Sequence, residues 1–256
     1  MGHASVWCPY ARLDPETLRV MLQSLSQPPF GLKFNKIGDY ERGYLVTLND
    51  EDRAARLRQA VGAARLSLAD SRRRPPFEFG YSCRGNGWYS VRLTEARAEW
   101  PQEFASAALR LLALSLSPAE GTAWPGTPGK GPFSNLHTTP NAAVARWLPA
   151  PGHGVPDTYI REPEIDDPRS PEFYEWLNYW SPATAAHLGF PDPVRDAEWL
   201  SRAEQLENGG WIIQLTPEPL DMEGRPDHVA TVRRFLERFP QIGFRDRPGL
   251  PPPRRT

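Results

Sequence analysis

A β-hairpin is the feature that most restricts the fold of this 256-residue chain. Apolar side chains alternate with other residues on both sides of a short turn, Arg84-Gly85-Asn86-Gly87. The alternating residues are Phe77, Phe79, Tyr81, Cys83, Tyr89, Val91 and Leu93. This period of two is typical of strands with one buried face, and Asn and Gly tolerate the positive φ angles of tight turns. The chain therefore contains an antiparallel strand pair.

Helical and strand patterns are intermixed around this hairpin. Asp14, Ser170 and Ser181 each precede a proline, which is a common start of a helix. The expected helices begin at Pro15, at Asn49 or Asp50 (ending near Leu68), at 101 (ending at 116), and at 170, 182, 196 and 226. The expected strands cover 5–10, 30–34, 44–48 and 211–216. This pattern predicts an α+β fold with an antiparallel or mixed sheet and packed helices.

The middle of the chain is rich in helix and strand breakers. Eight prolines and several glycines fall between residues 117 and 160, so we expect mostly loop there. The predicted organisation is an N-terminal α+β half (1–116), a Pro/Gly-rich connection (117–160), a C-terminal α+β half (161–244) and a disordered tail (245–256). Two domains and one domain with a long surface excursion both fit this pattern.

Composition indicates an ordinary cytoplasmic protein. The formal net charge of −1 gives no strong field that would recruit nucleic acid or a membrane. The N-terminus lacks the cationic and apolar segments of a signal peptide, and the apolar stretch at 109–116 is too short to span a bilayer. Cys8 and Cys83 are expected to be buried free thiols, as in a reducing compartment.

Catalytic, metal-binding and nucleotide-binding patterns are absent from the sequence. No two of the five histidines are three or four residues apart, and neither GxSxG nor GxxxxGK[ST] occurs. The Gly-rich run 121–131 is interpreted as a loop. We expect no cofactor, no metal and no catalytic residues. The rival hypothesis is an enzyme whose site uses His228, Asp227 or Cys83.

Two charged segments are candidates for binding. Residues 53–74 carry seven arginines against Asp70 alone, and a solvated helix face is a simpler interpretation than phosphate binding. An acidic segment interleaved with aromatic residues fits a surface for a basic protein partner. The candidate partner-binding residues are Glu162, Glu164, Asp166, Asp167, Glu172, Tyr174, Glu175 and Tyr179. The alternative is a helix with Trp176 and Trp180 in the core and its acids in solvent.

A family resemblance covers about residues 170–240. The matching motifs are Leu177-Asn-Tyr-Trp-Ser181, Thr184-Ala185, Leu188-Gly-Phe190, Gly209-Gly-Trp-Ile-Ile-Gln-Leu-Thr216, Pro219-Leu-Asp221 and Pro226-Asp-His-Val-Ala230. They resemble the C-terminal part of the immunity protein 52 family of bacterial polymorphic-toxin systems, and a related myxobacterial family of unknown function. The resemblance implies an α+β protein that binds and neutralises a cognate nuclease toxin without a cofactor. A structural accessory role in a secretion or phage-like system is a further alternative.

Overall fold

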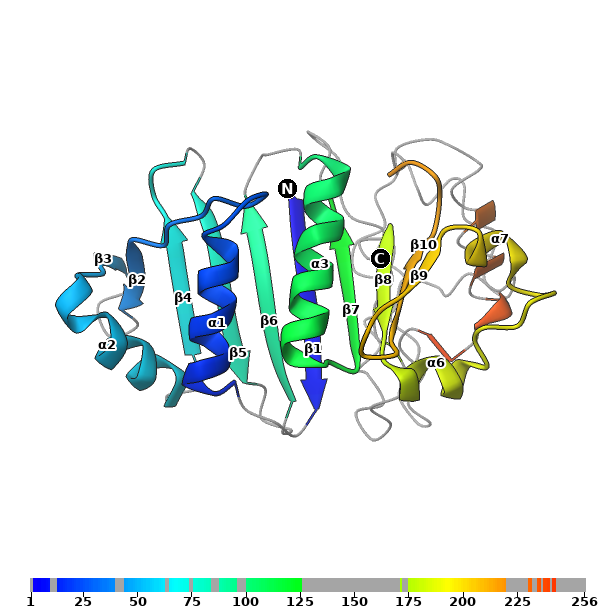
Figure 1. Ribbon diagram of the computed structural model, residues 1–256, viewed down its shortest axis with the longest axis horizontal. Coiled ribbons are helices and arrows are strands. Elements are labelled where there is room, and N and C mark those ends of the chain that lie inside the picture. Colours follow the sequence, from blue (N-terminus) through cyan, green and yellow to red (C-terminus); the bar gives the residue numbers. More distant parts are fainter. Residues whose placement is uncertain are drawn as a thin grey trace, which may run out of the picture.

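A single ten-stranded antiparallel sheet organises the part of the chain that this computed structural model describes (Figure 1). The described residues are 2–9, 13–39, 44–62, 65–73, 76–83, 88–95, 100–125, 171, 175–219, 230–231, 234–235, 237–239 and 241–242. The strand order is β3-β2-β4-β5-β6-β1-β7-β8-β10-β9, and every neighbouring pair is antiparallel. The predicted α+β class is confirmed.

Single strands or runs of two or three strands are separated by helices along the chain. The strands are β1 (Gly2–Pro9), β2 (Lys36–Asp39), β3 (Tyr44–Thr47), β4 (Arg65–Asp70), β5 (Phe77–Cys83), β6 (Trp88–Glu95), β7 (Glu120–Trp124), β8 (Leu177–Trp180), β9 (Ala203–Gln205) and β10 (Trp211–Gln214). The helices with described bounds are α1 (Pro15–Leu25), α2 (Asp50–Gly62), α3 (Gln102–Leu116), α6 (Pro182–Leu188) and α7 (Ala197–Leu200). No helix within these bounds has the length and apolar character that crossing a membrane requires.

Strand β7 joins the two halves of the chain into one sheet. It pairs with β1 on one side and with β8 on the other, inside the segment that the sequence predicted to be mostly loop. That prediction is wrong for residues 120–124, and most of the remaining segment lies outside the described residues. Gly121 lets the strand pass close to α3, because a Cβ there would lie 2.7 Å from Val6 Cγ1 and 3.0 Å from Leu109 Cδ1.

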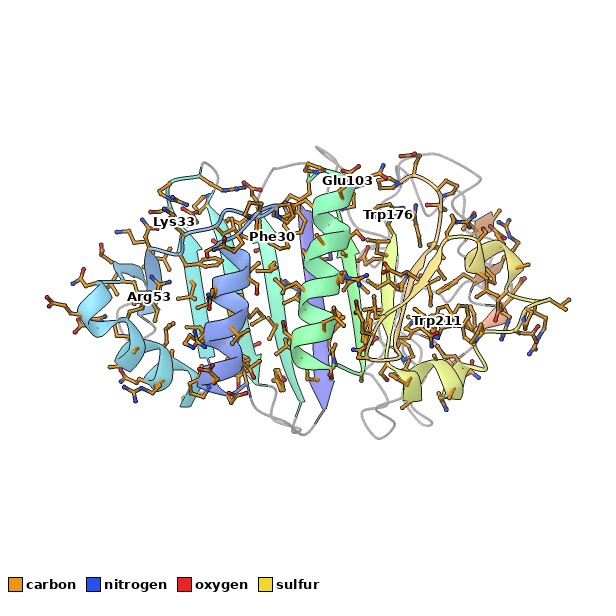
Figure 2. The ribbon with its side chains drawn as sticks, viewed as in Figure 1. Phe30, Lys33, Arg53, Glu103, Trp176 and Trp211 are labelled. Carbon is orange, nitrogen blue, oxygen red and sulfur yellow. The ribbon has the colours of Figure 1, made fainter. Side chains whose placement is uncertain are left out.

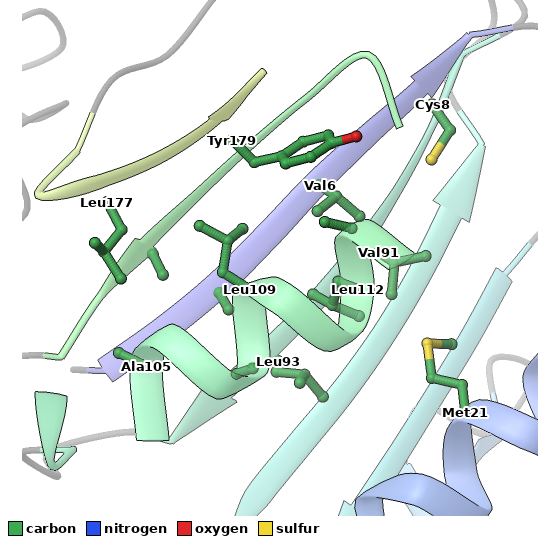
Figure 3. Packing of buried hydrophobic residues seen from close by; sticks show 14 of the residues in the cluster. Val6, Cys8, Met21, Val91, Leu93, Ala105, Leu109, Leu112, Leu177 and Tyr179 are labelled. Carbon is green, nitrogen blue, oxygen red and sulfur yellow. The ribbon is translucent and has the colours of Figure 1, made fainter. Parts of the chain in front are cut away.

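Helices α1 and α3 cover one face of the sheet (Figure 1). Figure 3 shows Leu109 and Leu112 of α3 packed over Val6 and Val91 of the central strands. The predicted start of α1 is confirmed, since the Asp14 carboxylate accepts the backbone N–H groups of residues 16 and 17 at 2.9 Å. These helices make the main apolar core between themselves and the sheet.

The side chains on the opposite face of the sheet differ in burial from strand to strand. Since Ala4 and Val6 of β1 belong to the core under α3, the intervening side chains of His3, Ser5 and Trp7 point the other way. All three are buried. The equivalent residues of β5, such as Glu78, are exposed. The far face is therefore buried over β1 and open to solvent at β5 and at Arg92 of β6.

An aromatic cluster closes the second half of the molecule. Trp180 lies at its centre, with ring centroids 5.4 Å from Phe190, 6.0 Å from Phe235 and 5.0 Å from Phe239. Trp199 adds a further ring beside Phe235, at 5.7 Å. The cluster attaches C-terminal residues to β8 and to the segment that follows it.

The sequence prediction of a helix that begins at Ser170 and carries Trp176 and Trp180 is wrong at its C-terminal end. Leu177–Trp180 is strand β8, and all four residues are buried. A strand buried on both faces loses the alternation that identifies strands, so the four-residue spacing of the two tryptophans suggested a helix. Both tryptophans are nevertheless core residues, as that interpretation also expected.

Three other element boundaries differ from the prediction. The helix expected to reach Leu68 ends at Gly62, and β4 begins at Arg65. The helix expected over 196–206 is only Ala197–Leu200, followed by β9. The strand expected over 30–34 is wrong, because Phe30 lies in a turn, Gly31 has φ 60° and residues 32–34 belong to no strand. The hairpin is confirmed by the pairing of β5 with β6, and the end of α6 by Gly189 at φ 66°.

Candidate functional site

The predicted partner-binding residues fall into two groups. Glu162, Glu164, Asp166, Asp167, Glu172 and Tyr174 lie outside the described residues. Glu175 and Tyr179 are described, and both are buried, with 2% and 0% of their surface exposed. These two residues therefore add nothing to an exposed surface. The residues of the rival enzyme hypothesis, Asp227, His228 and the Cys83 side chain, also lie outside the described part.

Tyr179 and Glu175 have interior roles instead. A Cβ on Gly210 would lie 2.5 Å from the Tyr179 hydroxyl, so the ring packs directly against the chain at that glycine. The hydroxyl accepts a hydrogen bond from Asn208 Nδ2 at 3.1 Å. The Glu175 backbone N–H donates to Asn178 Oδ1, and its carbonyl accepts from Asn178 Nδ2, both at 2.9 Å. Both residues hold the loops next to β8 and β10.

A cluster of polar groups lies on the far face of the central strands, and all of its members except the exposed Arg92 are buried. We call His3, Ser5, Arg92, Thr122 and Glu175 the central polar cluster. Arg92 Nε donates to Ser5 Oγ at 3.1 Å, and His3 Nε2 lies 3.9 Å from Glu175 Oε1. Sheet pairing brings these residues together, since Ser5 is opposite Arg92 on β6 and Thr122 on β7. Sequence reasoning missed the cluster, because its members are spread from residue 3 to residue 175.

The imidazole of His3 is held in its neutral form. Burial, with a further contribution from the Arg92 guanidinium, lowers the pKa of His3 to about 3. The 3.9 Å contact with Glu175 is therefore a contact between a neutral ring and a carboxyl group rather than an ion pair. His3 Nδ1 is buried and has no hydrogen-bond partner among the described residues.

The buried His3 predicts acid sensitivity. Its pKa in the folded protein is depressed, so it stabilises the fold above about pH 6.5, its unfolded pKa. That contribution is lost as the pH falls towards 3, by up to about 1.4 kcal/mol per pH unit. We expect His3→Gln to flatten the slope of unfolding free energy against pH between these values. Urea unfolding from pH 8 to pH 4 measures it, with pH 8 as the baseline of each variant. If the His3→Gln variant keeps the wild-type slope, the acid sensitivity does not come from His3.

A groove lies between α1 and α2 on the outside of the helical layer. Its volume is about 620 Å³. It is lined by Pro15, Glu16, Arg19, Leu22, Gln23, Ser26, Arg53, Ala54, Leu57 and Arg58. Leu22 and Leu57 give it an apolar floor, and both pack against the core. Figure 2 labels Arg53 at the α2 side of this α1–α2 groove.

Only some arginines of the Arg-rich segment 53–74 line the α1–α2 groove. Arg53 and Arg58 line the groove. Arg56 instead contacts Asp52 at 3.6 Å, and Arg72 contacts Asp70 at 2.5 Å. On α2, Arg58 is exposed and Arg53 and Arg56 are half-buried, so the helix keeps these arginines at or near solvent, as the interpretation of a solvated helix face expected. The packing of α1 beside α2 creates the groove, and that packing leaves no local mark in the sequence.

A metal site would need several acidic, histidine or cysteine side chains close together. In the described ranges, no group of three or more of these residues is placed to hold one. Cys8 is a buried free thiol, and burial raises its pKa to about 12. This part of the sequence prediction, a buried free Cys8, is confirmed.

A family model matches the central and C-terminal parts of the chain. The family described as "Domain of unknown function (DUF5953)" matches residues 91–247, which is more than half of the chain. The chain belongs to the DUF5953 family. No curated protein matches it.

The DUF5953 region does not form a self-contained structural unit. It includes most of β6 and all of β7, and these strands do not pair with each other, because β1 lies between them. The matched region therefore needs the N-terminal strand to complete its sheet. The central polar cluster spans this boundary, whereas the α1–α2 groove lies wholly N-terminal to the matched region.

Proposed function

We propose that this protein is a cytoplasmic immunity protein that binds and neutralises a cognate bacterial toxin, a nuclease. The proposal rests first on the resemblance of residues 170–240 to the immunity protein 52 family. Of the residues that carry this resemblance, those from Leu177 to Thr216 lie together in one packed unit. Trp180 is paired with Trp211, and Leu177 with Gln214, although these motifs are more than 30 residues apart in sequence. This unit is the observation that carries the proposal.

The motifs of this unit contribute packing, turns and caps. The Ser181 hydroxyl accepts the Thr184 N–H at 3.1 Å, and Gly209 adopts φ 79° at the turn before β10. Such residues build a rigid framework for a partner-binding surface. With Glu175 and Tyr179 buried, the proposed surface is reduced to the acidic residues 162–172 and Tyr174.

The chemistry of the partner favours an acidic surface. A nuclease carries positive charge where it binds nucleic acid, so carboxylates on an inhibitor accelerate the encounter and disfavour partners without that charge. The first test is co-expression with the product of the adjacent gene. Rescue of growth and a stable complex support the function. A complete lack of both contradicts it.

Charge reversal tests the location of the surface. The triple variant Glu164→Lys, Asp166→Lys and Asp167→Lys is expected to slow association with the toxin about tenfold at low salt, and less at high salt. Stopped-flow measurement of association at several salt concentrations is the readout. Glu78→Lys, on the exposed part of β5, is the control. If the triple variant keeps the wild-type affinity and rate, residues 164–167 do not belong to the interface.

A further inference from the structure

We propose that the α1–α2 groove is a docking site for an acidic amphipathic helix of a protein partner. This goes beyond the toxin proposal, because the groove is formed by residues 15–58 and that proposal rests on residues 162–240.

The shape of the groove fits a helix. Two neighbouring helices form its walls, and the apolar side chains of Leu22 and Leu57 lie at its base. Its volume of about 620 Å³ is in the range of clefts that bind ligands. An amphipathic helix binds such a groove by inserting apolar side chains at i and i+4 spacing. An apolar anchor over Leu22 and Leu57 is therefore the first feature required of the partner.

The charge of the groove selects an acidic partner. Its lining contains three arginines and one glutamate. Arg19 is already neutralised, because Nε and Nη2 donate to the two Glu16 carboxylate oxygens at 2.8 and 2.6 Å. Two positive charges, those of Arg53 and Arg58, remain to be matched.

Arg53 and Arg58 bind backbone oxygens rather than carboxylates. Arg53 Nη1 donates to the Phe34 carbonyl at 3.3 Å, and Arg58 Nε donates to the Ala54 carbonyl at 3.2 Å. Neither forms an ion pair with any carboxylate that the structure describes. Their remaining N–H groups can bind a partner's carboxylates, for which the planar guanidinium is well suited.

The spacing of the two arginines defines the partner further. They are five residues apart on α2, or about 7.5 Å along the helix axis. Carboxylates five residues apart on a partner helix have the same separation along its axis and, with 3.6 residues per turn, lie about 140° apart around it. The ligand class is therefore a helix with an apolar face and acidic residues on both sides of it.

A synthetic helix is the probe. It is a fluorescein-labelled, hydrocarbon-stapled peptide of about 15 residues, with two leucines four apart and glutamates beside them. A twin peptide carries lysine in place of each glutamate. We expect saturable micromolar binding of the acidic peptide by fluorescence anisotropy. The lysine twin should bind about tenfold more weakly or not at all.

Matched variants of α2 locate the binding. Ala54→Trp fills the groove, whereas Ala55→Trp places the same side chain on an exposed position of α2 that does not line it. Arg53→Glu with Arg58→Glu reverses the free charge, and Arg56→Glu is its control outside the groove. The two groove variants, Ala54→Trp and the double arginine reversal, should each weaken binding of the acidic peptide at least about tenfold. Each control should weaken it less than about twofold.

Folding of each variant is checked by thermal unfolding, and Arg53→Gln with Arg58→Gln replaces the reversal if that variant is unstable. Absence of saturable binding to the full-length protein up to about 1 mM overturns the proposal. Equal affinities for Ala54→Trp and Ala55→Trp overturn it as well. Either result leaves toxin neutralisation untouched, since that is measured by growth rescue and not with this peptide.

Discussion

Replacement of Trp180 with alanine is expected to lower the free energy of unfolding by about 3–5 kcal/mol. The side chain is 1% exposed and contacts the rings of Phe190, Phe235 and Phe239. Truncation removes the apolar surface of an indole and leaves a cavity that three rings cannot fill without moving. Because Trp180 also joins β8 to the C-terminal residues, the loss weakens the attachment of that segment to the sheet.

Urea unfolding and calorimetry measure this effect. A loss of this size lowers the melting temperature by roughly 10 °C in a protein of this length. Trp180→Phe keeps most of the ring volume and should lose less. Val194→Ala is the control, because Val194 is 86% exposed and contributes little packing. A Trp180→Ala protein as stable as the Val194→Ala protein would show that the aromatic cluster is not a centre of stability.

The elements that the sequence predicted correctly have strong local signals. The β5–β6 hairpin alternates on one buried face, and α1 and α6 begin with a capping residue followed by proline. These signals depend on residues within one turn or one strand pair. These signals do not depend on tertiary contacts, so they can be recognised in the sequence without knowing which elements pack beside them.

The missed strands lack such a signal because tertiary contacts determine them. All four residues of β8 are buried, and β7 contains a glycine that looks like a breaker but fits closely under α3. The order of the strands is also non-local. β1 pairs with β6 and β7, which begin more than 80 residues after it along the chain. Periodicity describes one element at a time and cannot predict which strands become neighbours.

The candidate sites show the same limit. The sequence identified Arg53 and Arg58 as part of a basic segment, but the groove exists only because α1 packs beside α2. It also assigned Glu175 to an acidic surface, whereas its Asn178 contacts and its position near His3 place it inside. Charge along the sequence predicts solvent exposure on average, and a buried carboxylate with local hydrogen bonds is the exception.

Replacement of Asp196 with alanine is expected to cost about 3–5 kcal/mol, because it breaks a buried ion pair. Asp196 is 0% exposed. Its carboxylate accepts from Arg238 Nε at 2.6 Å and Nη2 at 2.9 Å, and from the Asp192 N–H at 2.7 Å. The substitution leaves the Arg238 guanidinium without a carboxylate, although it still donates to the Gly189 carbonyl at 2.8 Å. Urea unfolding measures the loss.

A double-mutant cycle separates the interaction energy of Asp196 with Arg238 from the effect of removing either side chain alone. Arg238→Met keeps an apolar stem near the Phe239 ring, over which the guanidinium carbon lies at 4.5 Å, but leaves Asp196 unpaired. The double variant should therefore be more stable than the two single losses added together, by about 1–3 kcal/mol. Arg195→Ala breaks an exposed ion pair with Asp192 and should cost less than about 1 kcal/mol. If Asp196→Ala costs no more than Arg195→Ala, the Asp196–Arg238 pair does not contribute to the attachment of C-terminal residues to the α7 region.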